Sequence, residues 1–444
     1  MRVQIGLDRY SHDDAYLPQL LAQAHASGER ANCLCTNEMP ELVIAHVNGG
    51  YYLRRMPGTG QQHDPECAHF EVDPALSGRG NLEHSGAIQR DADSQKLIVK
   101  LGFSMSQKII AGDPLKETGD DLKVDAPVSD FVAKSSMRKL SLRGLLDLIY
   151  EEAGLSRRYP AMGTKRFWGI VGREIKKTIS QIRTAKQSIA KVTFVPQFAK
   201  SGEYISNNLA AGAFIDALKH VRGTVPFGYV VAQYHSVDTN YSDPRLIIRY
   251  CDERIKLPHK LYEQFAMYYQ DGLEATQNEG NPFIVLARVH REGKELVANQ
   301  LVGMPLDAYW LPVPDSALEA RVIEELIRSE RAFEVTLRHG APREQVTSTA
   351  TLLDTPRATA IYVAPLDEDE DDEDSDANGD PMGVTLSERK TLARWHAIVR
   401  NEAPGAMIIL PGQSIRLPAK RERSERAEAT STQTTQQTEV PAYD

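Results

Sequence analysis

Residues 32–69 read NCLCTNEMPELVIAHVNGGYYLRRMPGTGQQHDPECAH, and this stretch decides how the N-terminal part of the chain folds. It contains Cys33, Cys35 and Cys67, which are three of the four cysteines in the 444-residue chain. Cysteine thiolates and histidine imidazoles are the usual ligands of a tetrahedral zinc ion. Because one residue separates Cys33 from Cys35, their side chains point the same way from an extended chain. The spacing therefore predicts a zinc site with Cys67 as the third thiolate.

The fourth zinc ligand is either His63 or His69. His63 lies four positions before Cys67, so one tight loop or helical turn can bring both to the metal. The Cys67-x-His69 pair instead gives a C-x-C…C-x-H pattern that resembles the SWIM zinc finger, although its gap of 31 residues is long for that motif. We favour His63. Four protein ligands leave no position for water, so we expect a structural site. The alternative is three buried free thiols.

Size and composition exclude several classes of protein. A chain of 444 residues is expected to form two to four domains. No run of about 18 apolar residues is present, so no transmembrane helix and no membrane partner are expected. The first ten residues lack the apolar core of a secretion signal, and the cysteines are too few for a disulfide scaffold. We therefore expect a cytoplasmic protein.

Charge is distributed unevenly along the chain. The net charge is −9, and residues 367–376 alone hold nine acidic residues in ten positions. Residues 134–200 carry fifteen Lys or Arg against four Asp or Glu. A local basic segment of this kind is typical of nucleic-acid binding, even in a protein that is acidic overall. The acidic run is expected to be a solvated loop, with contact to a protein partner as a second interpretation.

The basic segment has the periodicity of two helices. Ser141 is a suitable N-cap for the first helix, and Gly154 suits its C-terminus. The second is predicted from about Thr164 to Ile182, with apolar residues at steps of three and four. With a short strand predicted at residues 191–195, the pattern resembles a helix-turn-helix or winged-helix layout.

The predicted nucleic-acid contacts are basic residues in two places, the strand at residues 51–56 and the two helices. Arginine and lysine would contact phosphates, and Tyr51 or Tyr52 could stack on a base. A plain antiparallel strand with one solvated face is the simpler interpretation of residues 51–56. The predicted contacts are Arg54, Arg55, Arg157, Arg158, Lys165, Arg166, Arg173, Lys176 and Lys177.

The last folded segment has the predicted order helix, strand, strand, strand, helix, strand, which resembles a PD-(D/E)xK nuclease core. Glu324, or its neighbour Glu325, on the helix, Asp354 at the end of the second strand and Lys390 on the later helix are the candidate catalytic residues for magnesium-dependent cleavage. The third strand, at residues 359–364, contains neither an acid nor a lysine. A nuclease is therefore an alternative, and no catalytic residue is assigned in the favoured interpretation.

These patterns together predict a multidomain α+β protein with a zinc-bound β-rich N-terminal module, a helical middle and a C-terminal α/β module. The expected segments are a zinc-binding domain at 1–130, a basic helical domain at 131–200, an α+β module at 201–312, an α/β module at 313–417 with an acidic loop at 366–380, and a disordered tail at 418–444.

Three segments together resemble the bacterial family called domain of unknown function 1173. They are the C-x-C knuckle, YYLRRMPGTGQQHDPEC at residues 51–67, and LRGLLDLIYEEAGLSRRYPAMGTKRFW at residues 142–168. The likeness covers most of residues 30–365. It implies an association with plasmids and integrated mobile elements, and it supplies no activity. By that pattern Cys33, Cys35 and Cys67 are the family's cysteines and His63 falls in its histidine position.

We therefore expect a zinc-stabilised accessory protein of a bacterial mobile element that binds DNA or RNA. The alternatives are a magnesium-dependent nuclease and a scaffold that binds proteins through the acidic loop.

Overall fold

The structure, a computed structural model, describes residues 2–47, 49–56, 58–91, 96–108, 138–163, 166–200, 202–221, 223–364, 386–410 and 413–421. Lys165, the acidic loop at 366–380 and residues 422–444 lie outside these ranges, so the predictions made for them are not addressed. Within the described ranges, helices accompany five sheets, which confirms the α+β class. Among the described helices, none is long and apolar enough to cross a membrane.

The N-terminal module is a five-stranded antiparallel sheet covered by one helix. Leu17, Leu21 and Ala24 lie at helical spacing and face Val3 and Leu42 of the sheet in one apolar cluster. The sheet order is β2-β1-β3-β4-β5. The elements are β1 (Arg2–Ile5), β2 (Asp8–Ser11), α1 (Leu17–Ser27), β3 (Ala31–Cys33), β4 (Glu41–Val47) and β5 (Gly50–Arg55).

The central region packs three helices against a small sheet. Ser141 caps α3 as predicted, because its Oγ accepts a hydrogen bond from the Gly144 N–H at 3.0 Å. Eight of the eleven residues of α3 are buried, which makes it the central helix of the molecule. The elements are α2 (Arg79–His84), β6 (Ile88–Arg90), β7 (Leu97–Val99), α3 (Leu142–Glu152), α4 (Trp168–Ile179) and β10 (Ile182–Arg183).

The second predicted helix is shorter than its periodicity suggests. Phe167 is extended and precedes α4, and Ile182 pairs with Leu97 in the small sheet instead of continuing the helix. The strand predicted at residues 191–195 is only β11 (Thr193–Phe194), and it pairs with a strand of the next module. The segment therefore forms no wing of its own.

Residues 228–305 close into a five-stranded barrel. The long strand β13 is bent by an irregularity between Tyr234 and Ser236; its first half pairs with β16 and its second half with β14. All pairings in the ring are antiparallel except β15 with β17. The strands are β13 (Gly228–Asp238), β14 (Arg245–Ile248), β15 (Arg254–Lys256), β16 (Phe283–Glu292) and β17 (Glu295–Pro305).

Helices α6 (His259–Tyr268) and α7 (Gln270–Asn278) connect the third barrel strand to the fourth, and Phe265 packs among the barrel's apolar residues. A closed ring in the order first, second, third, fifth, fourth, with a helix after the third strand, is the arrangement of an OB-fold. The helix α5 (Ile205–Ala217) precedes the barrel, and β8 (Ser106–Lys108) pairs with β12 (Thr224–Pro226) beside it.

The C-terminal module has the order predicted for it. Its sheet runs β21-β20-β19-β18-β9, and β20 pairs with β21 in parallel through the intervening helix α9. The elements are β9 (Arg157–Arg158), α8 (Ala317–Arg328), β18 (Phe333–Val335), β19 (Ala350–Leu352), β20 (Thr359–Val363), α9 (Leu386–Glu402) and β21 (Met407–Ile409).

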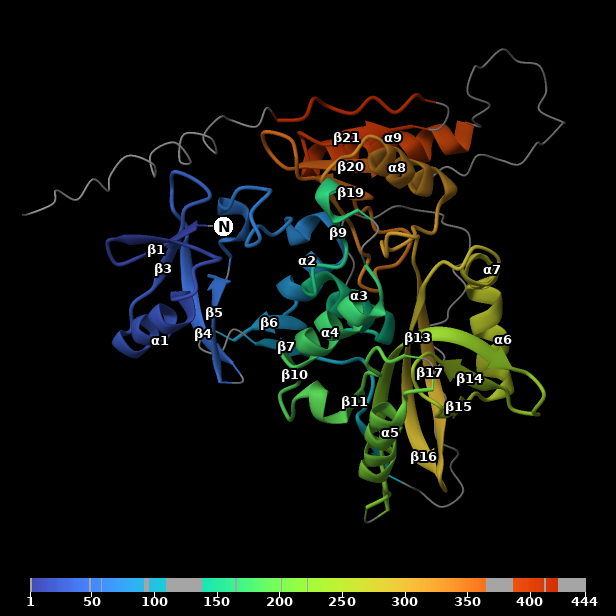
Figure 1. The fold of residues 1–444 in the computed structure, drawn as a ribbon. Helices are drawn as coiled ribbons and strands as arrows, with labels where there is room; N and C mark the ends of the chain where they lie inside the picture. Colours follow the sequence, from blue (N-terminus) through green and yellow to red (C-terminus); the bar gives the residue numbers. More distant parts are fainter. Residues whose placement is uncertain are drawn as a thin grey trace, which may run out of the picture.

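The modules meet around α3. Figure 1 shows α2, α3 and α4 between the N-terminal sheet, the barrel and the C-terminal sheet. Strands also pair between segments that the sequence assigns to different domains: β10 with β7, β11 with β13, and β9 with β18. One apolar cluster, from Leu82 to Leu337, accordingly includes residues from four of the predicted segments.

The start of the predicted disordered tail is held by the fold, which corrects that prediction for residues 418–421. The Pro418 carbonyl oxygen accepts a hydrogen bond from Arg331 at 2.9 Å. Arg421 forms a two-armed ion pair with Asp64, at 2.6 and 3.0 Å. The first contact joins the last described residues to the C-terminal module, and the second joins them to the N-terminal module.

Candidate metal centre, charged cleft and basic face

Three thiols and one imidazole converge at the edge of the N-terminal sheet. Cys33 ends β3, Cys35 follows it, and His63 and Cys67 come from the loop after β5. One ligand atom from each of the four residues lies within 4.8 Å of the others, and this is the one such group within the described ranges that could hold a metal ion. Cys33, Cys67 and His63 are buried, and Cys35 is half-buried.

The spacing of these atoms suits a tetrahedral ion. The Sγ atoms of Cys33 and Cys67 are 3.7 Å apart. The His63 Nδ1 lies 3.4 Å from the Cys35 Sγ and 3.9 Å from the Cys67 Sγ. A tetrahedral zinc site places two sulfurs about 3.8 Å apart and a sulfur and a nitrogen about 3.6 Å apart. These three distances are therefore close to those of such a site, and all four ligand atoms lie within 4.8 Å of one another.

The thiols together favour a cation. Hydrogen bonding to Cys33 lowers the pKa of Cys35, while hydrogen bonding to Cys35 raises the pKa of Cys33 to about 11. Contact with Cys33 likewise raises the pKa of Cys67. One thiolate thus prevents its neighbours from ionising, and three thiolates require a balancing positive charge. Backbone N–H groups of Asp64 and His69 donate to the sulfurs of Cys35 and Cys67 at 3.5 Å.

His69 lies next to the four candidate metal ligands but is not one of them. Its ring centroid is 5.6 Å from that of His63, and its buried Nε2 makes no hydrogen bond. Burial lowers the pKa of His69 to about 4, so the ring is neutral. The geometry favours His63 over His69 as the fourth ligand.

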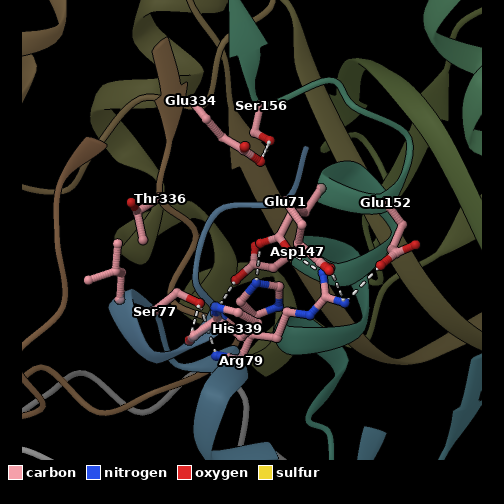
Figure 2. Close-up of polar contacts among 12 residues, drawn as sticks. Glu71, Ser77, Arg79, Asp147, Glu152, Ser156, Glu334, Thr336 and His339 are labelled. Carbon is pink, nitrogen blue, oxygen red and sulfur yellow. Dashed lines mark hydrogen bonds and ion pairs between the residues drawn. The ribbon is translucent and has the colours of Figure 1, made fainter. Parts of the chain in front are cut away.

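A charged cleft adjoins the cluster and centres on Arg79, a residue that the sequence did not indicate. Figure 2 shows Arg79 of α2 near carboxylates that include Glu71, from the loop after β5, and Glu152, from α3. The guanidinium pairs with Glu71 at 3.1 Å, Glu83 at 2.7 Å, Glu152 at 2.9 Å, and Glu151. Arg79 is only 3% exposed. Glu83 is four residues after Arg79 on the same helix, but Glu71 and the adjacent pair Glu151 and Glu152 come from other parts of the chain, so no local pattern could reveal the whole cluster.

Further ion pairs extend this cluster. His339 Nε2 lies 2.7 Å from Glu151, and Arg90 lies 2.9 Å from Glu152. Arg55 pairs with Glu71. A cavity of about 420 Å³ is lined by Arg79, Arg90, Glu151 and Glu152 and also reaches Lys177 on α4. Positive and negative side chains line it in nearly equal numbers, so it has no strong preference for an ion of either sign.

Five of the predicted nucleic-acid contacts are used inside the protein. The structure favours a fold-stabilising role for them, because each guanidinium is held by the protein's own groups. Arg54 donates to Gln181 at 2.7 Å, Arg55 pairs with Glu71, Arg157 pairs with Glu334 at 2.8 Å, Arg158 lies 4.2 Å over the Tyr309 ring, and Arg166 donates to the Leu155 carbonyl oxygen at 2.6 Å.

The remaining described contacts form an exposed basic face. Arg173, Lys176 and Lys177 are exposed on α4, at spacings of three and four that place them on one side of the helix. Val171, Ile175 and Ile179 on its other side are buried in the central core. Lys186 and Lys191 are exposed in the segment that follows.

The candidate nuclease residues do not form a metal-binding group within the described ranges. Asp354 is buried and accepts hydrogen bonds from Arg331 at 2.7 and 2.8 Å and from the Ala332 N–H at 3.0 Å. Glu324 and Lys390 are exposed on α8 and α9. The buried ion pair with Arg331 therefore indicates a structural role for Asp354.

Glu152 should make stability depend on acid pH. Burial alone would raise its pKa, but Arg90, Arg79 and Arg55 lower it to about 2, from 4.5. Its contribution is therefore complete above pH 4.5 and is lost as the pH falls towards 2, by about 3 kcal/mol. Denaturant unfolding between pH 7 and 3 should give a flatter pH dependence for Glu152→Gln than for wild type. If Glu152→Gln had the same pH dependence of stability as wild type, the prediction would be wrong. The control is Glu324→Gln, at an exposed position, which should keep the wild-type pH dependence.

Asp354→Ala should destabilise the fold by about 3–5 kcal/mol, because it leaves Arg331 buried without its carboxylate. Glu324→Ala, at an exposed position, should change stability by less than about 0.5 kcal/mol. Denaturant unfolding of both variants tests this. If Asp354→Ala were as stable as wild type and both variants lost a metal-dependent cleavage of DNA, the nuclease alternative would gain support.

Comparison with models of protein families matches residues 4–395 to the family described as "Protein of unknown function (DUF1173)". The match covers most of the chain, so the protein belongs to that family, as its cysteine knuckle and the segments 51–67 and 142–168 predict. No curated protein and no solved structure matches it.

Proposed function

We propose that this member of the DUF1173 family binds nucleic acid through the exposed face of α4, and that one structural zinc ion stabilises its N-terminal module. The observation that carries the proposal is the basic face formed by Arg173, Lys176 and Lys177. Residues 166–200 hold eight Lys or Arg against one acid, Glu174, so the segment can attract a phosphate backbone.

Glu174 leaves this face available. It lies 3.1 Å from Arg173 and 3.7 Å from Lys177, and both basic side chains are about two-thirds exposed. Exposed ion pairs contribute little free energy, so phosphates can replace the glutamate. The predicted contacts that are held internally would instead keep α4 in place.

The zinc proposal is supported by the donor set and its distances. Three sulfurs and the His63 Nδ1 occupy the corners that a tetrahedral ion needs, and they leave no corner for water or substrate. When bound, the ion would neutralise the thiolates and join β3 to the loop after β5. A role for the protein in a mobile element, and binding of a protein partner, stay predictions from the sequence.

The metal assignment predicts which substitutions remove zinc. Metal analysis of the purified chain should give about one zinc per protein, and Cys33→Ser and His63→Ala should lower that ratio sharply. His69→Ala should keep the wild-type zinc content. Cys251→Ser, which replaces a buried thiol of the barrel, should keep it as well. Retention of zinc by His63→Ala and its loss from His69→Ala would reverse the ligand choice, while a metal-free wild type would reject the site.

Neutralising the α4 face should weaken binding and its dependence on salt. Binding is measured by fluorescence anisotropy with a labelled oligonucleotide at several salt concentrations. The triple variant Arg173→Gln, Lys176→Gln, Lys177→Gln should make the negative slope of log binding constant against log salt concentration shallower by about 2 to 3, because each lost phosphate contact removes about 0.7–0.9 from its magnitude.

The matched control carries the same loss of charge on other exposed positions, Lys260→Gln, Lys294→Gln and Arg328→Gln. It should keep the wild-type slope. Equal effects from both triple variants, or wild-type affinity that does not respond to salt, would reject the α4 face as the binding surface.

A further inference from the structure

We propose that the nucleic acid is single-stranded and that its bases stack on an aromatic cluster at the N-terminal end of α4. This inference rests on the proposed function and specifies the ligand of the same surface. The cluster consists of Phe167, Phe198, Tyr204 and Tyr250, and most of it lies outside the apolar cores.

Four separate parts of the chain bring these rings together. Phe167 precedes α4, Phe198 follows β11, Tyr204 precedes α5, and Tyr250 lies between β14 and β15 of the barrel. The ring centroids of Phe167 and Phe198 are 5.3 Å apart in an edge-to-face arrangement, and those of Phe198 and Tyr250 are 5.4 Å apart. Figure 1 shows α4, β11 and α5 close together beside the barrel.

The cluster is open to solvent. Phe167 is 45% exposed and Phe198 is 49% exposed, although phenylalanine is among the residues most often buried. Tyr250 has a left-handed backbone with φ of 67°, which costs free energy for a residue with a side chain. Tyr250 is half-buried and packs against the central apolar cluster, so the surface offered to a flat partner consists mainly of the Phe167 and Phe198 rings.

The basic face continues directly from these rings. A Cβ atom added to Gly169 would lie 2.3 Å from the Phe167 ring, so that ring covers Gly169 on α4. Arg173 comes one helical turn after Gly169 on the same side of the helix. Arg249, next to Tyr250, is also exposed. Aromatic faces and cationic groups thus lie side by side along one surface.

This combination distinguishes a single strand from a duplex. In a duplex the faces of the bases are stacked inside the helix, and a protein ring cannot reach them without extruding a base. A single strand can offer a base face to Phe167 or Phe198 while its phosphates contact Arg173 and Lys176. The partner therefore has both negative charge and exposed planar bases, which an apolar protein segment would not have.

The barrel supports the same ligand class independently. Its strand order is that of the OB-fold, which holds single strands in several unrelated proteins, with the second and third strands contributing to the binding face. Tyr250 and Arg249 lie in the connection between these two strands. Fold alone does not assign a ligand, so the argument depends on the rings and charges at this connection.

The test measures the full-length protein against three labelled probes of equal length: an oligothymidine, an abasic deoxyribose-phosphate strand and a duplex. Wild type should bind oligothymidine more tightly than the other two. Phe167→Ala and Phe198→Ala should each weaken oligothymidine binding roughly 5- to 100-fold and leave binding to the abasic strand unchanged, because only base stacking is lost.

Three controls make the result interpretable. Phe198→Tyr should keep near wild-type affinity, since tyrosine also stacks. Leu209→Ala, at a 71% exposed apolar position on α5, should have no effect. The salt slope should stay the same in the phenylalanine variants, which separates stacking from the phosphate contacts of α4. Thermal unfolding confirms that each variant is folded.

The outcomes separate the two proposals. Equal affinity for single strand and duplex, together with wild-type binding by both phenylalanine variants, would reject the stacking site while the salt response of the α4 variant still supported nucleic-acid binding. Absence of binding to all three probes would reject both proposals. Loss of binding in Leu209→Ala equal to that in the phenylalanine variants would indicate an apolar protein-docking surface instead.

Discussion

The buried guanidinium of Arg79 is the interaction on which the arrangement of modules depends. Four carboxylates surround it, and removing the cation would leave them in mutual repulsion inside the protein. Two of these carboxylates, Glu151 and Glu152, are at the end of the central helix α3, and Glu71 comes from the loop that also carries His63 and Cys67. One side chain therefore links the metal module to the core.

Other ion pairs and hydrogen bonds also join the N-terminal module to the rest of the protein. Arg157 binds Glu334 of the C-terminal sheet and also the carbonyl oxygen of Phe70 near the cluster, both at 2.8 Å. Arg421 reaches Asp64 from the end of the described chain. Charged groups and apolar contacts thus both hold the N-terminal module to the remainder, since its apolar cluster also includes Ala332 and Leu353 of the C-terminal module. A metal ion at the cysteine cluster would keep the loop that carries several of these partners in one position.

The distribution of arginines follows from this architecture and separates structural from binding residues. Arginine supplies several donors in a rigid plane, so it can satisfy two or more acceptors at once when buried. Arg157 does this with Glu334 and the Phe70 carbonyl oxygen, and Arg166 does it with the carbonyl oxygens of Leu155 and Arg157. Arg173 and Lys177 on α4 pair with Glu174 in exposed ion pairs, and the basic residues of this helix face solvent near the exposed Phe167 and Phe198 rings. The basic residues that are concentrated in this part of the sequence therefore fall into two groups. One group holds the modules together, and the other is available to a ligand.

The sequence alone determined features that depend on neighbouring residues. The one-residue gap between Cys33 and Cys35 predicted their shared direction, Ser141 predicted a helix start, and the apolar spacing predicted α3 and the order of the C-terminal elements. The closure of the barrel, the set of carboxylates around Arg79 and the contacts of Phe198 with Phe167 and Tyr250 became visible only in the tertiary structure. Each of these joins residues that are distant in the chain. The local sequence pattern around a strand or a charged residue does not identify the distant residue that it contacts. For that reason a basic residue such as Arg55 could be identified from the sequence, whereas its use within the fold could not.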